Sequence, residues 1–122
     1  MSEFNLRDKI ENWDKKEIVR FSLFCCHKVR HLMNKESLKV VKLVERWLED
    51  ETSVSEEELG RATDCAHNAT RIAYYTAHAA YYNDYTFSAY YATHYTAKAL
   101  ISSKEALYLE YMRGRLSDIM EN

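Results

Sequence analysis

The chain has 122 residues, no proline and only two glycines, and it carries 17 basic and 19 acidic side chains, for a formal net charge of -2. This length suits one domain and leaves no room for a second. The scarcity of proline and glycine excludes the turn-rich chemistry of a sandwich or barrel and favours long helices. The slightly negative balance gives no general attraction to nucleic acid, so no nucleic-acid partner is expected.

The cellular compartment is predicted from the first residues of the chain, from the absence of a long apolar segment and from the cysteines. Residues 1–12 are polar and charged, so no signal peptide is expected. No segment offers the roughly 20 apolar residues of a membrane span, so no membrane partner is expected. Three cysteines, Cys25, Cys26 and Cys65, cannot all pair within one chain, which favours reduced thiols and a cytoplasmic location.

Capping signals predict three helices in the N-terminal part of the chain, at about residues 1–13, 15–33 and 36–49. Ser2 or Asn5 could start the first helix, and Asp14 is a suitable N-cap for the second. The third helix follows Asn34. Asp14 is followed three residues later by Glu17, as in a capping box. The second helix carries a buried stripe made of Ile18, Phe21, Ser22, Cys25, Cys26, Val29, Leu32 and Met33. The third is amphipathic and is expected to lie at the surface of the domain.

An acidic linker at residues 50–55 leads into the second half of the chain. Ser55 and Glu58 form the strongest capping box in the sequence, so a long helix is expected over residues 56–82. Gly60 lies within its first turns, where glycine costs about 1 kcal/mol relative to alanine. This cost predicts a close neighbour that leaves no space for a side chain.

Two further helices are expected after the long one. Asn83 or Asp84 begins a helix that runs to about Ile101. Ser102, with Glu105 three residues later, begins a last helix that runs to about residue 120. The predicted fold class is therefore an all-α, single-domain bundle of five to six helices that includes residues 1–122.

Small residues recur at alternating spacings of four and three along two stretches of the second half. The first seam consists of Ala62, Ala66, Ala69, Ala73, Thr76 and Ala80. The second consists of Ala89, Ala92, Thr96, Ala99, Ser103 and Ala106. At about 100° per residue each seam occupies one narrow helix face. We expect a long antiparallel hairpin whose backbones approach closely along these two seams.

Aromatic, histidine and basic side chains occupy the faces opposite the seams. Those of the first stretch are His67, Arg71, Tyr74, Tyr75, His78, Tyr81 and Tyr82, and those of the second are Phe87, Tyr90, Tyr91, His94 and Lys98. A tyrosine combines a large apolar ring with a hydroxyl that needs a partner, which suits interfaces and ligand pockets. The alternative is that these rings pack on the N-terminal helices, but ten tyrosines exceed what a small core can satisfy. The predicted partner-binding residues are Tyr74, Tyr75, His78, Tyr81, Tyr82, Tyr90, Tyr91 and His94.

The sequence signals for anion binding, metal binding and catalysis are weaker than the signal for a partner-binding surface. An anion or a phosphate is the second candidate ligand, bound by Arg20, His27, His31, Arg71 and Lys98, although basic stripes are commonly only solvated. His27 and His31 have the spacing of a helical metal-ligand pair, but Cys25 and Cys26 lie on a different face, so no metal is expected. We expect no cofactor. Cys65 lies on a buried face and the core positions lack paired carboxylates, so no enzyme activity is expected.

Three segments resemble a known family: residues 20–33 (RFSLFCCHKVRHLM), residues 38–80 (LKVVKLVERWLEDETSVSEEELGRATDCAHNATRIAYYTAHAA) and residues 88–102 (SAYYATHYTAKALIS). They are similar to the helical family of immunity proteins associated with bacterial polymorphic toxin systems, over about residues 13–101. The shared features are an amphipathic helix ending in Trp-Leu, a short acidic connection, and tandem helices rich in alanine and histidine. The tyrosine pairs of this chain depart from the family pattern.

The resemblance implies a non-enzymatic protein that neutralises a toxin by occupying its surface. A phage-encoded inhibitor of a bacterial defence protein would have the same sequence features, so both remain open. The residues alone leave two further alternatives. One is a protein that sequesters a small nucleotide signal through tyrosine stacking and basic residues. The other is a structural homo-oligomer in which the tyrosine faces meet their own copies.

Overall fold

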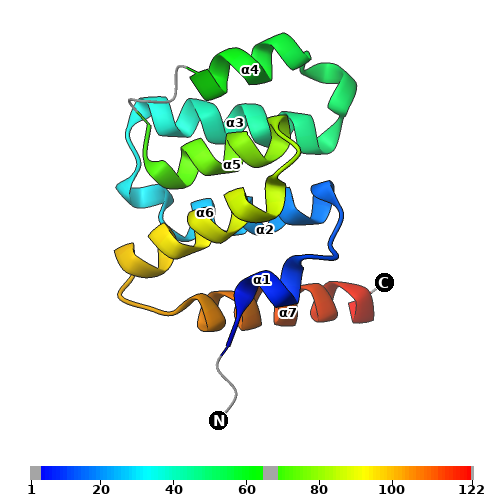
Figure 1. Ribbon diagram of the computed structural model, residues 1–122, viewed down its shortest axis with the longest axis vertical. Helices are drawn as coiled ribbons and strands as arrows, with labels where there is room; N and C mark the ends of the chain where they lie inside the picture. Colours follow the sequence, from blue (N-terminus) through cyan, green and yellow to red (C-terminus); the bar gives the residue numbers. More distant parts are fainter. Residues whose placement is uncertain (1–3, 65–68, 122) are drawn as a thin grey trace.

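The structure, a computed structural model, describes residues 4–64 and 69–121, with side chains as far as Leu116. This part of the chain forms seven α-helices that pack together in one domain (Figure 1). They are α1 (Leu6–Ile10), α2 (Lys15–Lys28), α3 (Lys35–Glu49), α4 (Glu56–Asp64), α5 (Arg71–Tyr81), α6 (Tyr85–Ala99) and α7 (Lys104–Glu121). Two 3-10 turns are added at Arg30–Leu32 and Glu51–Ser53. The predicted all-α class is confirmed, with more helices than the five to six expected.

Most helix starts follow from their capping residues. The side chains of Asn5, Asp14 and Asn34 each accept a hydrogen bond from the backbone amide three residues later, at 3.3, 2.8 and 2.9 Å. The amide of Glu58 donates to Ser55 Oγ at 3.0 Å, and the amide of Ser55 donates to Glu58 Oε1 at 3.3 Å. These local bonds satisfy amides that no helical carbonyl can reach, so the starts could be predicted from sequence.

The prediction of one continuous helix over residues 56–82 is wrong, because α4 and α5 are separate helices. Thr70 provides the start of α5, since its Oγ1 accepts a hydrogen bond from the amide of Ala73 at 3.3 Å. The amide of Thr70 donates to Ser37 Oγ on α3 at 2.7 Å. This tertiary bond holds the start of α5 against a distant helix, which periodicity does not reveal. The expectations for Cys65, Ala66 and His67 lie outside the described residues.

Two other boundaries differ from the predictions. Helix α2 ends before Met33, so Leu32, expected in the buried stripe, lies in a 3-10 turn and is 59% exposed. Ser103, rather than Ser102, caps α7: its Oγ accepts a hydrogen bond from the amide of Ala106 at 3.0 Å. The amide of Ser102 instead donates to the carbonyl of Ala97 at 2.8 Å and so closes the end of α6.

Helix α2 lies at the centre of the packing and contacts α3, α5, α6 and α7. In Figure 1 it lies behind α6, with α5 beside it. Cys25 Sγ lies 3.7 Å from Thr93 Oγ1 of α6, and Cys26 Sγ lies 3.1 Å from Thr76 Oγ1 of α5. Small residues of α5 and α6 therefore meet α2, and the two helices also contact each other.

Among the described residues, the fully buried part of the two small-residue seams lies within α5 and α6. Their buried members are Ala73, Thr76, Ala80, Ala89, Ala92 and Thr96. Ala99, Ser103 and Ala106 are exposed, so the second seam does not continue as expected. The reason is that α6 ends at Ala99 and the chain turns before α7 begins.

Helix α7 is held on α2 by polar bonds that surround an aromatic contact. The hydroxyl of Tyr111 donates a hydrogen bond to Glu17, and Arg115 Nη2 lies 3.0 Å from Glu17 Oε1. Lys28 Nζ lies 2.7 Å from Glu110 Oε1. The Tyr111 ring is buried beside Phe21 and Phe24 of α2. Its hydroxyl is therefore hydrogen-bonded to Glu17 in apolar surroundings.

This setting predicts how stability responds to alkaline pH. Burial and the hydrogen bond to Glu17 raise the pKa of Tyr111 above its ordinary value of about 10. Because the folded pKa exceeds the unfolded one, the contribution of the hydroxyl is complete below about pH 10 and is lost as pH rises further. Tyr111→Phe should cost about 1 kcal/mol at neutral pH, and its difference from wild type should shrink above about pH 10. Urea unfolding followed by circular dichroism measures both, and a constant difference would contradict the prediction.

Ile101 has a backbone conformation that its side chain disfavours. Its φ is 52°, in the left-handed region, and its side chain is 97% exposed. The amide of Ile101 donates to the carbonyl of Lys98 at 3.3 Å, next to the bond that closes the end of α6. This arrangement is a Schellman motif, in which glycine is the usual residue at this position.

Replacement of Ile101 by glycine should therefore stabilise the protein. A β-branched residue in the left-handed region is strained by about 1 kcal/mol, and no burial offsets the strain here. Ile101→Gly should raise the free energy of unfolding by about this amount, measured by urea denaturation. Ile101→Ala serves as the control, because it removes the branched side chain but keeps a Cβ. A glycine variant less stable than both the alanine variant and wild type would refute this account.

Candidate functional site

The rings of α5 and α6 form one continuous surface, instead of the two separate outward faces expected from the sequence. Tyr75 of α5 stacks on Tyr91 and Tyr95 of α6, with ring centroids 5.4 and 6.1 Å apart. Because both small-residue faces also meet α2, the two helices are rotated so that their aromatic rows converge. We name this set the aromatic surface; it consists of Tyr74, Tyr75, His78, Tyr82, Phe87, Tyr90, Tyr91, His94 and Tyr95.

The aromatic surface has an inner and an outer layer. Tyr74, Tyr90 and Tyr95 are half-buried and also pack on the hydrophobic core. Tyr82 and Phe87 are 40% and 42% exposed and lie outside the core. The outer layer, which also includes the half-buried Tyr75 and Tyr91, thus rests on rings that the fold holds in place.

Tyr81, which was predicted to bind the partner, packs closely on Gly60 of α4. A Cβ added at Gly60 would lie 3.0 Å from the Cζ and hydroxyl of Tyr81. The Tyr81 ring is half-buried against the core. Among the described residues, its ring contact with the aromatic surface is with Tyr82, at a centroid distance of 4.7 Å. The absence of a side chain at Gly60 lets this ring pack closely, in line with the close neighbour expected there.

His78 links the two helices beneath the outer rings. Its Nδ1 lies 2.6 Å from Ser88 Oγ of α6, and its ring centroid lies 4.2 Å from that of Tyr82. Asp84 Oδ1 lies 3.7 Å from the same Nδ1. Burial lowers the pKa of His78, while the carboxylate of Asp84 partly opposes this shift. His78 is therefore a neutral, hydrogen-bonded ring near neutral pH.

Most tyrosine hydroxyls of the aromatic surface are free to bind a partner. Burial raises the pKa of Tyr75, so its hydroxyl stays protonated and can donate. Tyr95 accepts a hydrogen bond from Arg71 Nη1 at 2.7 Å. Within the described residues, a buried side-chain nitrogen or oxygen without a hydrogen bond occurs only at Glu45 Oε1, which faces His27. The unbonded hydroxyls of the aromatic surface are therefore open to solvent.

Positive charges surround the α6 half of the aromatic surface. The guanidinium carbon of Arg7 lies 4.7 Å from the centroid of the Tyr90 ring, and Lys104 Nζ lies 5.2 Å from it. The guanidinium carbon of Arg71 lies 5.2 Å from the Tyr95 ring centroid. The sequence did not single out Arg7 or Lys104, because only the packing of α1 and α7 brings them to α6. Tyr95 was also missed, although it lies one turn after Tyr91.

A hollow of about 500 Å³ lies beside the aromatic surface, between α4 and α5. Its lining residues are Thr63, Asp64, Ala69, Arg71, Tyr74, Tyr75 and Tyr82. Arg71 is thus the predicted anion-binding residue that comes closest to the predicted tyrosines. Asp64 places a negative charge in the same hollow, which weakens its attraction for phosphate.

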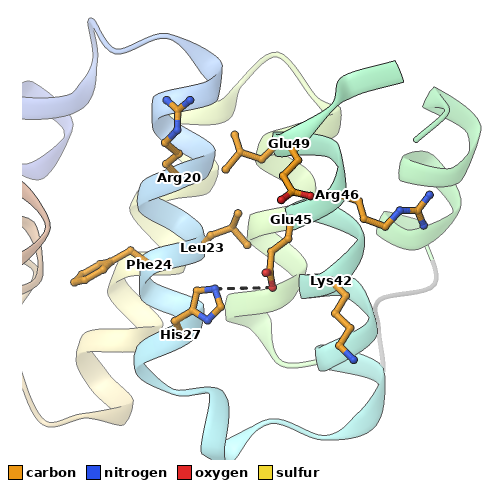
Figure 2. A pocket seen from close by; sticks show the side chains of 9 residues that line it. Arg20, Leu23, Phe24, His27, Lys42, Glu45, Arg46 and Glu49 are labelled. Carbon is orange, nitrogen blue, oxygen red and sulfur yellow. Dashed lines mark ion pairs between the residues drawn. The ribbon is translucent and has the colours of Figure 1, made fainter. Parts of the chain in front are cut away.

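The other predicted anion-binding residues do not form one site. Arg20 and His27 lie in a groove of about 700 Å³ between α2 and α3, lined also by Leu23, Phe24, Lys42, Glu45, Arg46, Leu48 and Glu49. Figure 2 shows His27 and Glu45 pointing toward each other, with His27 Nε2 3.9 Å from Glu45 Oε1. His31 is exposed in the 3-10 turn after α2, and Lys98 is exposed near the end of α6. The two carboxylates in the groove, Glu45 and Glu49, offset only part of its positive charge.

The described residues hold no group of three or more His, Cys, Asp or Glu side chains that could bind a metal ion. Burial raises the pKa of Cys25 and of Cys26 to about 12, so both thiols stay protonated and unreactive near neutral pH. None of the described helices is both long enough and apolar enough to cross a membrane.

Comparisons with family models, with curated proteins and with solved structures found no match to this chain. The fold and the aromatic surface therefore define a class only: a small all-α protein with a preformed surface of tyrosine and histidine rings.

The position of His78 predicts an acid-dependent loss of stability. Its folded pKa is lower than its unfolded value of about 6.5, so the unfolded chain binds the proton more readily. Stability is therefore lost as pH falls below about 6.5. His78→Gln should lose less stability than wild type between about pH 7.5 and pH 5, measured by urea unfolding. Histidines common to both proteins cancel in the comparison, and parallel pH profiles would contradict the prediction.

Proposed function

We propose that this protein is a non-enzymatic binding protein that neutralises a toxin or a bacterial defence protein by covering part of its surface. The observation that carries this proposal is the aromatic surface on α5 and α6. Its outer rings are half-buried or exposed and are held by contacts with one another. Rings that are ordered before binding lose little conformational entropy when a partner arrives.

The chemistry of the aromatic surface suits a protein partner. Tyrosine is enriched among the residues that dominate binding energy in protein interfaces, because it offers both apolar area and a hydrogen bond. The exposed parts of Tyr82 and Phe87 offer apolar contact, and the free hydroxyl of Tyr91 offers a donor and an acceptor. A partner surface of ordinary size can therefore engage several anchors at once.

The resemblance to helical immunity proteins supports neutralisation of a toxin over other binding roles. A phage inhibitor of a bacterial defence protein fits the same surface, because either task requires only tight and passive occupation of the target. Neither role requires a catalytic group in this protein.

A sequestering protein for a small nucleotide is the alternative supported by the hollow beside Arg71. In that case a base would lie on Tyr74 or Tyr82 and a phosphate would meet the guanidinium. Heat denaturation of the purified protein, followed by ultraviolet spectroscopy of the supernatant, separates the two functions. A released nucleobase spectrum favours sequestration, and its absence favours a protein partner.

A structural homo-oligomer is the remaining alternative, since exposed rings of one copy can pack on those of another. Sedimentation velocity distinguishes it. A monomer keeps the aromatic surface available for a different protein. A stable oligomer that Phe87→Ala dissociates would assign the surface to self-association.

The proposal predicts that the most exposed rings carry partner binding but little stability. Tyr82→Ala combined with Phe87→Ala should weaken partner binding by about 30-fold or more, as expected for hot-spot residues. The same double substitution should lower the free energy of unfolding by about 1 kcal/mol or less, because both side chains lie outside the core. Quantitative affinity purification from the source cells, followed by binding measurements on the recovered protein, checks both expectations.

The matched control replaces two exposed leucines away from the aromatic surface, Leu32 and Leu109, by alanine. A partner retained by this control and lost by the aromatic variant supports the proposal. Co-expression then tests whether wild type, but not the aromatic variant, relieves the toxicity or the defence activity of that partner. Recovery of every bound protein by both variants alike would refute the proposed binding surface.

A further inference from the structure

Four cations near the α6 half of the aromatic surface have no acidic partner. Arg7 and Lys104 lie over the Tyr90 ring, and Arg71 lies over the Tyr95 ring. Lys98 lies one helical turn after His94 on the same face of α6. Within the described residues none of these four cations forms an ion pair. We name this set, with the rings of Tyr90, Tyr91, His94 and Tyr95, the cationic half.

The cationic half is distinct because three of its cations converge on neighbouring rings of one helix, α6. Some other cations of the chain are paired with carboxylates. Lys16 lies 3.0 Å from Glu51, and Lys28 lies 2.7 Å from Glu110. The acids next to Arg7 and Lys104 in the chain form no ion pair with these two cations. These two, Asp8 and Glu105, line a groove between α1 and α7.

Negative charge lies at the opposite end of the aromatic surface. Asp84 is near His78 at the start of α6. Asp64 lines the hollow beside Tyr82, but it shares this hollow with Arg71. Along α6 the positive charge therefore lies near Tyr90 and the later turns, and a carboxylate lies at the start of the helix. Such a division fixes the orientation of a partner and selects for complementary charge.

Resting on the proposed function, we infer that the partner is a protein that presents an acidic surface to the cationic half. Carboxylates of the partner meet Arg7, Lys98 and Lys104, while tyrosine hydroxyls donate hydrogen bonds to the same carboxylates. The cations already lie against rings, so fewer of their side-chain rotamers are lost on binding.

The same arrangement disfavours a single-stranded nucleic acid. Binding of this kind depends on free aromatic faces on which bases stack. Here other rings of the protein already stack on these faces. Tyr75 is stacked with Tyr91 and Tyr95, at interplanar angles of 25° and 8°. Two cations and the stacked His94 ring surround Tyr90. The edges and hydroxyls that remain suit carboxylates better than bases.

The test uses a fluorescein-labelled hexaglutamate peptide as the probe, with fluorescence anisotropy and ¹H–¹⁵N spectra of the full chain as readouts. The peptide should shift signals of the cationic half, and binding should weaken as salt increases. The triple variant Arg7→Glu, Lys98→Glu and Lys104→Glu should weaken peptide binding by about tenfold or more. The triple variant should still unfold in one cooperative thermal transition, because Arg7 and Lys98 are exposed and Lys104 is only half-buried.

The control carries the same charge change at exposed cations elsewhere: Lys35→Glu, Lys42→Glu and Arg113→Glu. Equal weakening by both triple variants would overturn the inference, as would peptide shifts centred on the groove between α2 and α3. Tighter binding of a labelled deoxythymidine hexamer than of the peptide would instead assign the cationic half to nucleic acid.

The natural partner separates this inference from the proposed function. A partner lost by the aromatic double variant but kept by the charge triple variant would overturn the acidic surface and leave the binding function intact. Peptide binding at the cationic half, together with no protein that depends on the aromatic rings, would overturn the proposed function.

Discussion

The contact between the two adjacent cysteines of α2 and the threonines of α5 and α6 is the constraint on which the rest of the structure depends. Cys25 meets Thr93, and Cys26 meets Thr76. Since these side chains are small, three helices approach closely at one line, and the rotation of α5 and α6 about their own axes is set. The large rings of both helices are thereby brought to the same side of the pair. The aromatic surface is a consequence of this packing, and not a property of either helix alone.

This packing also explains why the side chains of the aromatic surface are held in place. The inner rings rest on the core, His78 is bonded to Ser88, and the outer rings lie against each other. These side chains would therefore lose little conformational entropy on binding a partner. The ends of α1 and α7 then bring Arg7 and Lys104 to α6, so charge and aromatic area come from elements far apart in the chain. The proposed role as an inhibitor rests on these two properties.

The candidate site shows how far sequence reasoning reached. Spacing along each helix identified most of the rings, because residues of one face recur at fixed intervals. It assigned Tyr81 to the same face, but that ring packs on α4, where Gly60 leaves space for it. It did not single out the cations of α1 and α7, because no local pattern marks which helix ends will meet. The five predicted anion-binding residues are spread over separate places for the same reason.

The sequence by itself determined the helical class and most helix starts, since caps such as Asp14 and Ser55 act within three residues. Only the tertiary structure decided that α4 and α5 separate, because Thr70 is bonded to Ser37 on another helix. It also decided that two aromatic rows become one surface, because that depends on how helices rotate against α2. Hydrogen bonds between residues close together in the chain can be predicted from the sequence. Contacts between distant helices depend instead on the packing of the whole core.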